Sequence, residues 1–545
     1  MEPRRGALHG RSRRRAHSAT GTGGPTRMVR MALSRTALPV WVAALSTLLL
    51  AGCASLPPIG SRVASKAWTD TSSTALGRAL ASDVAAHPGR TGVHTIERPS
   101  DAFAARVLLA DAAERSLDVQ YYLWRADLSG TLLFDALRRA ADRGVRVRLL
   151  LDDVNTGGLD ETLAMLDAHP DIEVRLYNPF ANRRARMADF ASDFARVNRR
   201  MHNKSFTADN QVTIVGGRNI GDEYFGAGEG IAFADLDVIA AGAIVRDVSA
   251  AFDLYWNSPA AYPAASLLPP PGPDAAARFD AEVARVRADP AARAYAAAAR
   301  ETPLFSDLVA GRLPLEWTQV TLVRDDPDKT LSPVDRPEQL LLSALLPAFG
   351  TVERSFDLVS PYFVPGDDGT ATLVRMAKAG VRVRVLTNSL ATSDVSAVHA
   401  GYATRRAALL EAGVQLWEFK PPDVRRDHKR SITGSRAGSL HAKTFAADSR
   451  RIFVGSFNFD QRSARLNTEM GFVIESPALA RRLGAMFDRD LPTLAWEVRR
   501  SPDGAIEWIE TSASGETRHS VEPGTGPLER ATIRALSVLP IEWLL

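Results

Sequence analysis

The sequence predicts an α/β protein made of two pseudo-symmetric units in one chain, each with a mostly parallel sheet between layers of helices. Short segments of the first half recur in the second half in the same order, which indicates a duplicated unit. Each recurring block has the pattern of a helix, a glycine and an alternating strand. Strands that alternate with helices favour parallel pairing with helices on both faces of the sheet.

Three pairs of segments carry the repeat. Residues 114–119 (Glu-Arg-Ser-Leu-Asp-Val) recur as residues 353–358 (Glu-Arg-Ser-Phe-Asp-Leu), an offset of 239 residues. Two further pairs follow in the same order, 143–148 with 379–384 and 172–177 with 413–418. In the first unit, apolar spacing predicts a helix over 132–142, which Gly144 ends before an alternating strand.

The remaining segments differ in composition from the two units. A proline-rich break at 269–273 precedes an alanine-rich stretch, 274–301, that we expect to be a helical insertion. Near the end, two short strands around residues 502–504 predict a hairpin. The expected domains are a basic leader and signal peptide (1–52), a linker (53–95), the first half (96–260), a linker with the insertion (261–335), the second half (336–492), and a hairpin with an apolar C-terminal helix (493–545).

The leader has the pattern of a signal peptide. Residues 1–36 contain nine arginines and one acid, and an apolar run over 37–51 ends in Leu50-Ala51-Gly52-Cys53. This ending resembles the bacterial lipoprotein signal, which implies that Cys53 is lipidated and anchors the protein in the cell envelope, facing the periplasm or the exterior. An ordinary signal peptide with a chance cysteine is the alternative.

Composition excludes several classes of site. The chain has one cysteine, so it forms no internal disulfide, and a cysteine-ligated zinc site is not expected. No spacing is typical of metal ligands, and we expect neither a metal nor a cofactor. The net charge of +4 depends on the leader, because residues 53–545 carry 58 basic and 62 acidic side chains and are about −4. A general nucleic-acid-binding surface is therefore not expected.

The strongest signal is a His-x-Lys-x4-Asp motif that occurs once in each half. His, Lys and Asp, together with a later Asn, all shift by the same 239 residues as the repeat. The two sets are His202, Lys204, Asp209 and Asn219, and His441, Lys443, Asp448 and Asn458. Only seven of the 67 basic residues are lysines, and two of the seven lie in these motifs. A compact ammonium, which arginine cannot replace, is therefore expected at both positions.

These residue types suit the chemistry of a phosphodiester. Lys204, Lys443, Asn219 and Asn458 would neutralise and hydrogen-bond its non-bridging oxygens. One imidazole would attack phosphorus while the other protonates the leaving alkoxide and later activates an alcohol or water.

Carboxylates are expected to support the motif residues. Each ring needs a partner on its other nitrogen, and we assign Asp237 and Glu469, in Asp235-Leu236-Asp237 and Asn467-Thr468-Glu469, to that role. Asp209 and Asp448 complete the motifs and are expected to pair within the motif turn.

The motifs resemble those of the phospholipase D superfamily over about residues 100–490. Residues 217–225, 458–463 and 539–545 are similar to bacterial cardiolipin synthases, especially their C-type branch. The resemblance implies two α/β units that share one metal-independent site, with His202 as nucleophile and His441 as acid/base, although pseudo-symmetry leaves this order open. Gly217 and Ser456 join the expected phosphate-binding set.

The implied activity is phosphatidyl transfer that makes cardiolipin, with phosphatidylglycerol and possibly phosphatidylethanolamine as substrates at a membrane surface. A hydrolytic phospholipase D with water as acceptor is the close alternative, and a nuclease or an inactive lipid-binding protein is less favoured. A partner protein is not indicated by any motif.

Two further features leave alternatives open. Arginines gather in two loops ahead of the motifs, around 183–200 and 425–436, and form either a collar that attracts anionic headgroups or an ordinary solvated surface. The apolar C-terminal helix, about 528–545, could lie in the membrane interface or pack on the domain core.

Overall fold

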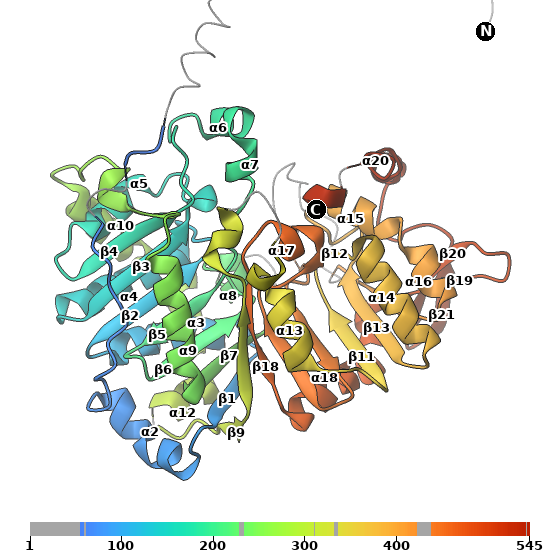
Figure 1. Ribbon diagram of the computed structural model, residues 1–545, viewed down its shortest axis with the longest axis horizontal. Helices are drawn as coiled ribbons and strands as arrows, with labels where there is room; N and C mark the ends of the chain where they lie inside the picture. Colours follow the sequence, from blue (N-terminus) through green and yellow to red (C-terminus); the bar gives the residue numbers. More distant parts are fainter. Residues whose placement is uncertain are drawn as a thin grey trace, which may run out of the picture. The chain divides into compact units, whose positions relative to one another are not determined.

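Two large sheets, each flanked by helices, form the fold in a computed structural model that describes residues 55–58, 62–227, 234–309, 311–331, 336–421, 438–540 and 542–545. Figure 1 shows the blue-to-green half of the chain around one sheet and the yellow-to-red half around the other. The expected leader 1–52, the lipidation site Cys53 and most of the second basic loop lie outside the described residues. The two-unit α/β fold is confirmed.

The first sheet has the order β8-β4-β3-β2-β5-β6-β7-β1-β9. Its strands, in chain order, are β1 (Thr91–Ile96), β2 (Ser116–Tyr121), β3 (Arg146–Asp152), β4 (Ile172–Tyr177), β5 (Ser205–Ala208), β6 (Val212–Gly216), β7 (Asp237–Gly242), β8 (Ala261–Pro263) and β9 (Glu316–Thr318). The helices of this half are α2 (Ala75–Ala86), α3 (Pro99–Ala112), α4 (Leu128–Asp142), η1 (Asp153–Asn155), α5 (Asp160–Asp167), α6 (Arg186–Ser192), α7 (Phe194–Val197), α8 (Asp222–Phe225) and α9 (Ala243–Trp256).

The second sheet has the order β10-β18-β16-β15-β11-β13-β14-β19-β20-β21. Its strands are β10 (Val320–Arg324), β11 (Ser355–Val359), β13 (Arg382–Asn388), β14 (Gln415–Phe419), β15 (Thr444–Ala447), β16 (Arg451–Gly455), β18 (Met470–Ile474), β19 (Ala495–Arg500), β20 (Ile506–Ser512) and β21 (Gly515–His519), with a separate pair β12 (Phe363–Val364) and β17 (Phe459–Asp460). Its helices are α13 (Leu341–Phe349), α14 (Gly366–Lys378), α15 (Ser396–Ala403), α16 (Arg406–Glu411), α17 (Gln461–Arg465), α18 (Pro477–Arg489) and α19 (Leu491–Leu494).

The expectation of mostly parallel sheets is wrong. Parallel pairing within the two large sheets is confined, among the described strands, to β2–β3–β4 and β11–β13–β14. These are the strands that a helix separates in the sequence, as the repeat analysis expected. β5 and β15, which follow the motif lysines, are each joined to the next strand by only three residues. A connection this short permits only an antiparallel neighbour.

An equivalent buried ion pair joins β2 to β3 in the first half and β11 to β13 in the second half, and its residues belong to the recurring segments. In the first half, Arg148 Nε donates to Asp118 Oδ1 at 2.7 Å. In the second half, Arg384 Nε donates to Asp357 Oδ1 at 2.6 Å. Gly144, with φ +85°, follows α4 in the left-handed conformation that ends a helix, as the sequence predicts.

The two halves share a hydrophobic core. Residues from β6, β7 and α9 pack with residues from β15, β16, β18 and α18, and all of them are buried. One segment of chain also crosses from sheet to sheet: β9 pairs with β1, and after one residue β10 pairs with β18. The sheets are therefore joined both by packing and by a continuous stretch of backbone.

Elements outside the two units largely follow the sequence pattern. The insertion forms η2 (Ala264–Ser266), α10 (Ala275–Ala288), α11 (Pro290–Arg300) and α12 (Pro303–Val309), followed by η3 (Pro327–Thr330) and η4 (Pro337–Gln339). The expected hairpin is the antiparallel pair β19–β20. The C-terminal helix is shorter than expected: α20 (Pro527–Leu536) ends well before η5 (Glu542–Leu544).

The C-terminal segment packs on the domain and also leaves apolar side chains in solvent. Ile533 is buried against Leu390 and Ala400, and the last carbonyls accept hydrogen bonds from Arg462. Leu528 and Trp543 are exposed. Within the described ranges, no helix has the length and apolar character needed to cross a membrane.

Asp209 and Asp448 hold equivalent positions, each after the strand, β5 or β15, that its motif histidine precedes. Asp209 accepts hydrogen bonds from the backbone N–H groups of residues 114–116 at 2.7–3.0 Å, and Asp448 accepts the corresponding three from residues 353–355. Both residues have positive φ, near 50°. Their partners lie at the start of the neighbouring strand, so the expectation that they pair within the motif turn is wrong. Each aspartate instead fixes the start of β2 or β11.

Replacing Asp209 by alanine should lower the free energy of unfolding by about 3 kcal/mol, because three backbone donors lose a buried carboxylate. Urea unfolding followed by circular dichroism would measure the loss. Asp448→Ala is the matched control: its side chain is more exposed, so the loss should be smaller. Equal effects of the two substitutions would contradict this account.

Candidate active site

Short backbone bridges between the halves place the two motif histidines. Met201 forms an isolated parallel bridge with Thr468, and the His202 N–H donates to the Thr468 carbonyl at 2.9 Å. The same arrangement is found in the other motif, where Leu440 bridges Ala234 and the His441 N–H donates to the Ala234 carbonyl at 2.8 Å. Each histidine therefore follows a contact with the opposite half of the chain.

The carboxylate that contacts each imidazole also comes from the opposite half. His202 Nδ1 lies 2.8 Å from Glu469 Oε2, as the sequence predicts. His441 Nδ1 lies 2.6 Å from Asp235 Oδ2. All four side chains are largely buried. With the carboxylate ionised, each contact favours the Nδ1–H tautomer and leaves Nε2 as the lone-pair nitrogen.

The assignment of Asp237 to the orienting role is wrong, because Asp235 contacts His441, and the strand register gives the reason. Gly216 and Gly455 are equivalent in the repeat; Gly216 pairs with Asp237, whereas Gly455 pairs with Gly471. Two residues before these partners stand Asp235 and Glu469, which are therefore the equivalent pair. Asp237 instead forms a buried ion pair with Arg106, 2.9 Å away, and lies beside Arg218.

Small residues in the predicted phosphate-binding set support the carboxylates instead. Ser456 Oγ donates to Glu469 Oε2 at 2.5 Å, and Ser463 Oγ donates to Glu469 Oε1 at 2.8 Å. A Cβ on Gly217 would lie 2.2 Å from Asp235 Oδ1, so glycine provides the space for that carboxylate. The expectation that Gly217 and Ser456 bind phosphate is therefore corrected. Ser463, which the sequence analysis missed, lies within the quoted 458–463 motif.

The motif lysines are buried beside their histidines. Lys443 Nζ lies 3.1 Å from His441 Nδ1 and donates to the His441 carbonyl at 2.6 Å. Lys204 Nζ donates to the His202 carbonyl at 2.5 Å and lies 5.5 Å from the centre of the Tyr122 ring. Burial lowers the pKa of Lys204 to about 7 and that of Lys443 to about 8. A bound anion would replace the lost solvation and favour both ammonium ions.

The two histidine–carboxylate pairs differ electrostatically. Burial raises the pKa of Glu469 to about 7, whereas the charges of His441 and Lys443 outweigh burial and hold the pKa of Asp235 below its usual value. Burial and both lysine charges lower the pKa of His202 well below its usual value. Burial and Lys443 lower the pKa of His441 to about 4, against the opposing effect of Asp235. His441 thus faces the more firmly ionised carboxylate.

Further polar and aromatic groups complete the site. The side-chain oxygens of Asn219 and Asn458 are buried and have no hydrogen-bond partner within the described structure, so the unused capacity of these atoms is that of an acceptor, and only the Nδ2 groups could donate to a phosphate. Asn219 Nδ2 donates to the Tyr224 hydroxyl at 3.0 Å. Tyr122 packs edge-to-face on His202 and Tyr224 on His441, with ring centres 4.8 and 5.0 Å apart. Both tyrosines limit the orientation of the rings.

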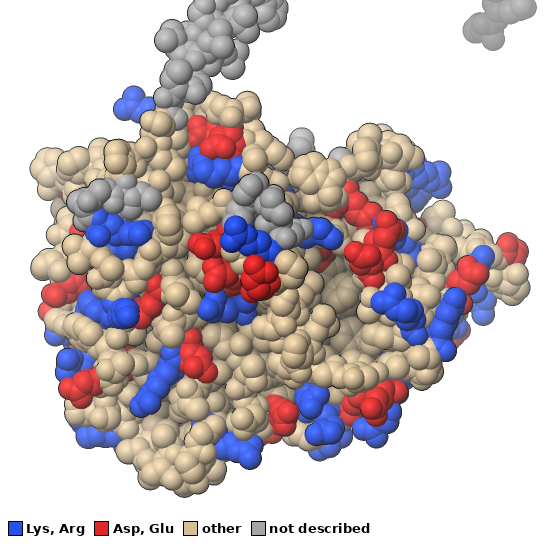
Figure 2. All heavy atoms as spheres, viewed as in Figure 1, with Lys and Arg blue, Asp and Glu red and all other residues tan. Residues whose placement is uncertain are grey.

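The first basic loop is largely neutralised by internal carboxylates. Arg183 and Arg186 pair with the buried Asp153, and Arg200 pairs with Asp152. Arg196 pairs with Asp193, Arg199 donates to the Lys329 carbonyl, and Arg184 is exposed. Figure 2 likewise shows basic and acidic side chains side by side on one face. This loop is therefore mainly structural, and the structure does not support a collar there.

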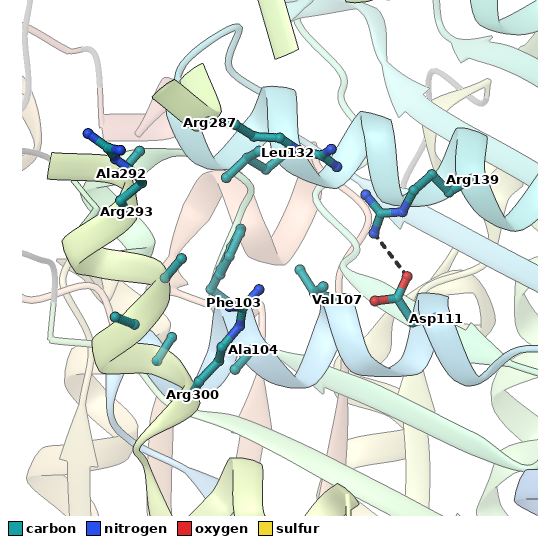
Figure 3. A pocket seen from close by; sticks show the side chains of 13 residues that line it. Phe103, Ala104, Val107, Asp111, Leu132, Arg139, Arg287, Ala292, Arg293 and Arg300 are labelled. Carbon is teal, nitrogen blue, oxygen red and sulfur yellow. Dashed lines mark hydrogen bonds and ion pairs between the residues drawn. The ribbon is translucent and has the colours of Figure 1, made fainter. Parts of the chain in front are cut away.

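A cavity of about 760 Å³ lies away from the motifs between α3, α4 and α11 (Figure 3). Its lining contains none of the motif residues. Arg139 pairs with Asp111 on its wall. Across the described ranges, no three His, Cys, Asp or Glu side chains are grouped closely enough to hold a metal ion.

Some known proteins are similar to this chain in sequence, and one solved structure is similar to it in fold. The family model described as "Cardiolipin synthase, PLD-like domain" matches residues 108–256 and 345–491. Cardiolipin synthase C of Escherichia coli is 49% identical over 461 residues, which cover 84% of this chain and 97% of that protein. A cardiolipin synthase of Clostridium perfringens is 24% identical over 71% of this chain and 68% of its own. The crystal structure of phosphatidylserine synthase from Haemophilus influenzae is similar in fold, with a TM-score of 0.52 and 13% identity over 86% of this chain and 100% of that one.

The correction from Asp237 to Asp235 can be tested on the imidazole itself. In Asp235→Asn, His441 loses its anionic acceptor, so the ¹⁵N chemical shifts of its ring should depart from the Nδ1–H tautomer. Asp237→Asn, the matched control, should leave those shifts unchanged and lower the melting temperature, because Arg106 loses its charged partner. A change of tautomer in Asp237→Asn alone would contradict the assignment.

Proposed function

Because the chain belongs to the family of phospholipase D-like cardiolipin synthases, it is a phosphatidyltransferase, and we propose that it makes cardiolipin through a covalent intermediate on His202. A phosphatidyl group would pass from a donor phospholipid to His202 and then to phosphatidylglycerol. The observation that carries the proposal is the pair of buried imidazoles, each held by a carboxylate of the opposite half, with a lysine beside each ring.

We assign the nucleophile to His202, as the family resemblance implies. Its pKa is well below the usual value, chiefly through burial, so Nε2 keeps its lone pair at neutral pH, and the same holds for His441, whose pKa burial and Lys443 lower to about 4. Attack forms a P–N bond and breaks the P–O bond to the headgroup. The raised pKa of Glu469 disfavours a stable imidazolium, which keeps the ring neutral before the attack.

His441 is placed to move the proton. A bound phosphodiester brings negative charge beside Lys443 and so raises the affinity of His441 for a proton, which the ionised Asp235 supports. Nε2 then protonates the departing alkoxide. In the second step it accepts the proton of the incoming alcohol, whose oxygen attacks phosphorus and displaces His202 Nε2.

Lys204 and Lys443 are proposed to bind the non-bridging phosphate oxygens, with the amides of Asn219 and Asn458. These contacts strengthen as charge develops on phosphorus, so they stabilise the transition state more than the substrate. Buried ammonium groups act in a region of low dielectric, where such contacts are stronger than in water.

Hydrolysis is the second candidate, because water could replace the alcohol at the same intermediate. A nuclease is disfavoured by the charge of about −4 that remains without the leader. We further propose that lipidated Cys53 anchors the protein in the cell envelope, facing the periplasm or the exterior, and that phosphatidylethanolamine is a possible donor.

Protein lacking residues 1–53 should convert phosphatidylglycerol vesicles into cardiolipin in the presence of EDTA, with and without added phosphatidylethanolamine. Phosphatidic acid without cardiolipin would indicate hydrolysis, and loss of activity in EDTA would contradict a metal-independent reaction. With a phosphatidyl donor whose leaving group needs no proton, such as p-nitrophenol, His441→Asn should trap a phosphatidyl adduct on His202, visible by mass spectrometry, because the second step lacks its base. His202→Asn is the matched control and should form no adduct.

The value of kcat/KM should fall as pH rises through about 7 to 8. The lowered pKa values of Lys204 and Lys443 mean that the free enzyme loses positive charge there, and kcat/KM reports ionisations of the free enzyme. Lys204→Arg should be less active at neutral pH and should move the alkaline decline upward, because arginine stays charged. An unchanged alkaline decline in Lys204→Arg would exclude Lys204 as its source.

A further inference from the structure

A tyrosine–aspartate pair lies in the half of the chain that holds His441, and none of the steps described above uses it. The Tyr362 hydroxyl donates to Asp394, whose two oxygens lie 2.9 and 2.8 Å away. Asp394 is exposed in the loop between β13 and α15, and Tyr362 is half-buried. Among the described residues, Tyr362 is the one hydrogen-bond donor to this carboxylate, which therefore has the capacity to accept from a further donor.

Strand register places Tyr362 beside His441. β11 and β15 are antiparallel, and Val359 pairs with Thr444. Three residues beyond this pair, the same register sets Tyr362 opposite His441. Val359 and Thr444 both line a cavity on one face of the sheet. Successive side chains alternate between the two faces, so Tyr362 and His441 lie together on the other face.

The electrostatic interactions of the pair agree with this placement. The Tyr224 ring centre lies 5.0 Å from that of His441. Burial raises the pKa of Tyr362 well above its usual value, and Asp394 and Tyr224 add to this effect. Burial lowers the pKa of Lys443 to about 8, and the charge of Asp394 is one of four carboxylate charges that oppose this effect. Asp394 is therefore close enough to the catalytic centre to act on its lysine.

The first half has different residues at both equivalent positions. The isolated bridge that follows β2 and the β12–β17 pairing have equivalent registers, so Leu123 occupies the position of Tyr362. α5 begins eight residues after β3 ends, and α15 begins eight residues after β13 ends, so Gly158 is equivalent to Asp394. An aliphatic residue and a glycine thus stand on the side of His202 where the other half has a hydroxyl and a carboxylate.

The side of His441 is where the alcohol of the headgroup must lie. His441 gives its proton to the departing alkoxide and takes one from the incoming alcohol, so the oxygen of that alcohol lies within hydrogen-bond reach of the ring. Beyond this oxygen, glycerol carries further hydroxyls and ethanolamine carries an ammonium group. These groups donate hydrogen bonds, and a carboxylate accepts such bonds more strongly than a neutral group does.

We propose that Asp394, positioned by Tyr362, binds the hydroxyl or ammonium group that the headgroup alcohol carries beyond its reacting oxygen. This inference rests on the proposed function and names the part of the substrate that the second half recognises. The hydrogen bond from Tyr362 holds the carboxylate in place before the alcohol arrives. The contact favours such an alcohol over water, which carries no second functional group, and so favours transfer over hydrolysis.

Competition between acceptors tests the proposal. The full chain in detergent micelles would be given phosphatidyl-p-nitrophenol with equal concentrations of glycerol and 1-propanol, which has the same three carbons and one hydroxyl. Asp394→Asn should lower the ratio of phosphatidylglycerol to phosphatidylpropanol about tenfold. Asparagine keeps one oxygen for Tyr362 but replaces the second oxygen by an amide donor. Asp503→Asn, the same substitution at an exposed position in the β19–β20 turn, is the matched control and should leave the ratio unchanged.

A second arm with ethanolamine in place of glycerol distinguishes an ammonium group from a hydroxyl as the group that Asp394 binds. A fall of either ratio supports the proposal, and two unchanged ratios in folded Asp394→Asn protein would overturn it. Equal losses of all products would indicate that Asp394 only anchors its loop, and would also overturn it.

Tyr362→Phe keeps the carboxylate but removes the hydroxyl that positions it, so it should lower the same ratio by a smaller factor. This variant decides the matter if Asp394→Asn fails to fold, and an unchanged ratio would then overturn the proposal. Release of p-nitrophenol without transfer to any alcohol would contradict the proposed function and the inference with it. Transfer with unaltered ratios would overturn the inference alone.

Discussion

The exchange of carboxylates between the halves is the constraint on which the site depends. His202 is oriented by Glu469 and His441 by Asp235, so neither half contains a complete catalytic pair. The backbone bridges just before each histidine fix the register of this exchange. The shared core and the continuous β9–β10 segment also hold the two sheets in place. This matters because any sliding of one sheet against the other would separate both histidine–carboxylate pairs at once.

Buried acids extend this constraint into the framework. Asp152 accepts the Met201 N–H at 2.8 Å, and Asp325 accepts the Glu469 N–H at 2.8 Å. Burial raises the pKa of each to about 6. Met201 and Glu469 lie on either side of one bridge between the halves, so the two acids hold the backbone around His202 from both directions. The imidazole is thus oriented through its own ring and through the main chain.

The sequence could predict the motif residues because their chemistry is local and their offset is shared. The sequence could also predict Glu469, because an acid that follows the second motif can accept a hydrogen bond from an imidazole and orient it. Asp237 was the wrong choice in Asp235-Leu236-Asp237, because the connections before β7 and β18 differ in length and a fixed offset no longer identifies equivalent positions. Ser456 and Gly217 were misassigned for a related reason: their role is to support a carboxylate that arrives from a distant part of the chain.

Duplication gives the site its near-symmetry, and the residues around it differ between the halves. Transfer through a covalent intermediate consists of two similar displacements, which suits two equivalent imidazoles and two equivalent lysines. The packing of the two halves is less symmetric than the motifs: Tyr255 of α9 lies in a buried aromatic cluster, whereas a hollow lies beside Met486 of α18, the equivalent helix of the second half. The carboxylates differ as well, because an aspartate contacts His441 and a glutamate contacts His202. The repeat therefore preserves the reacting groups more closely than the residues that surround them.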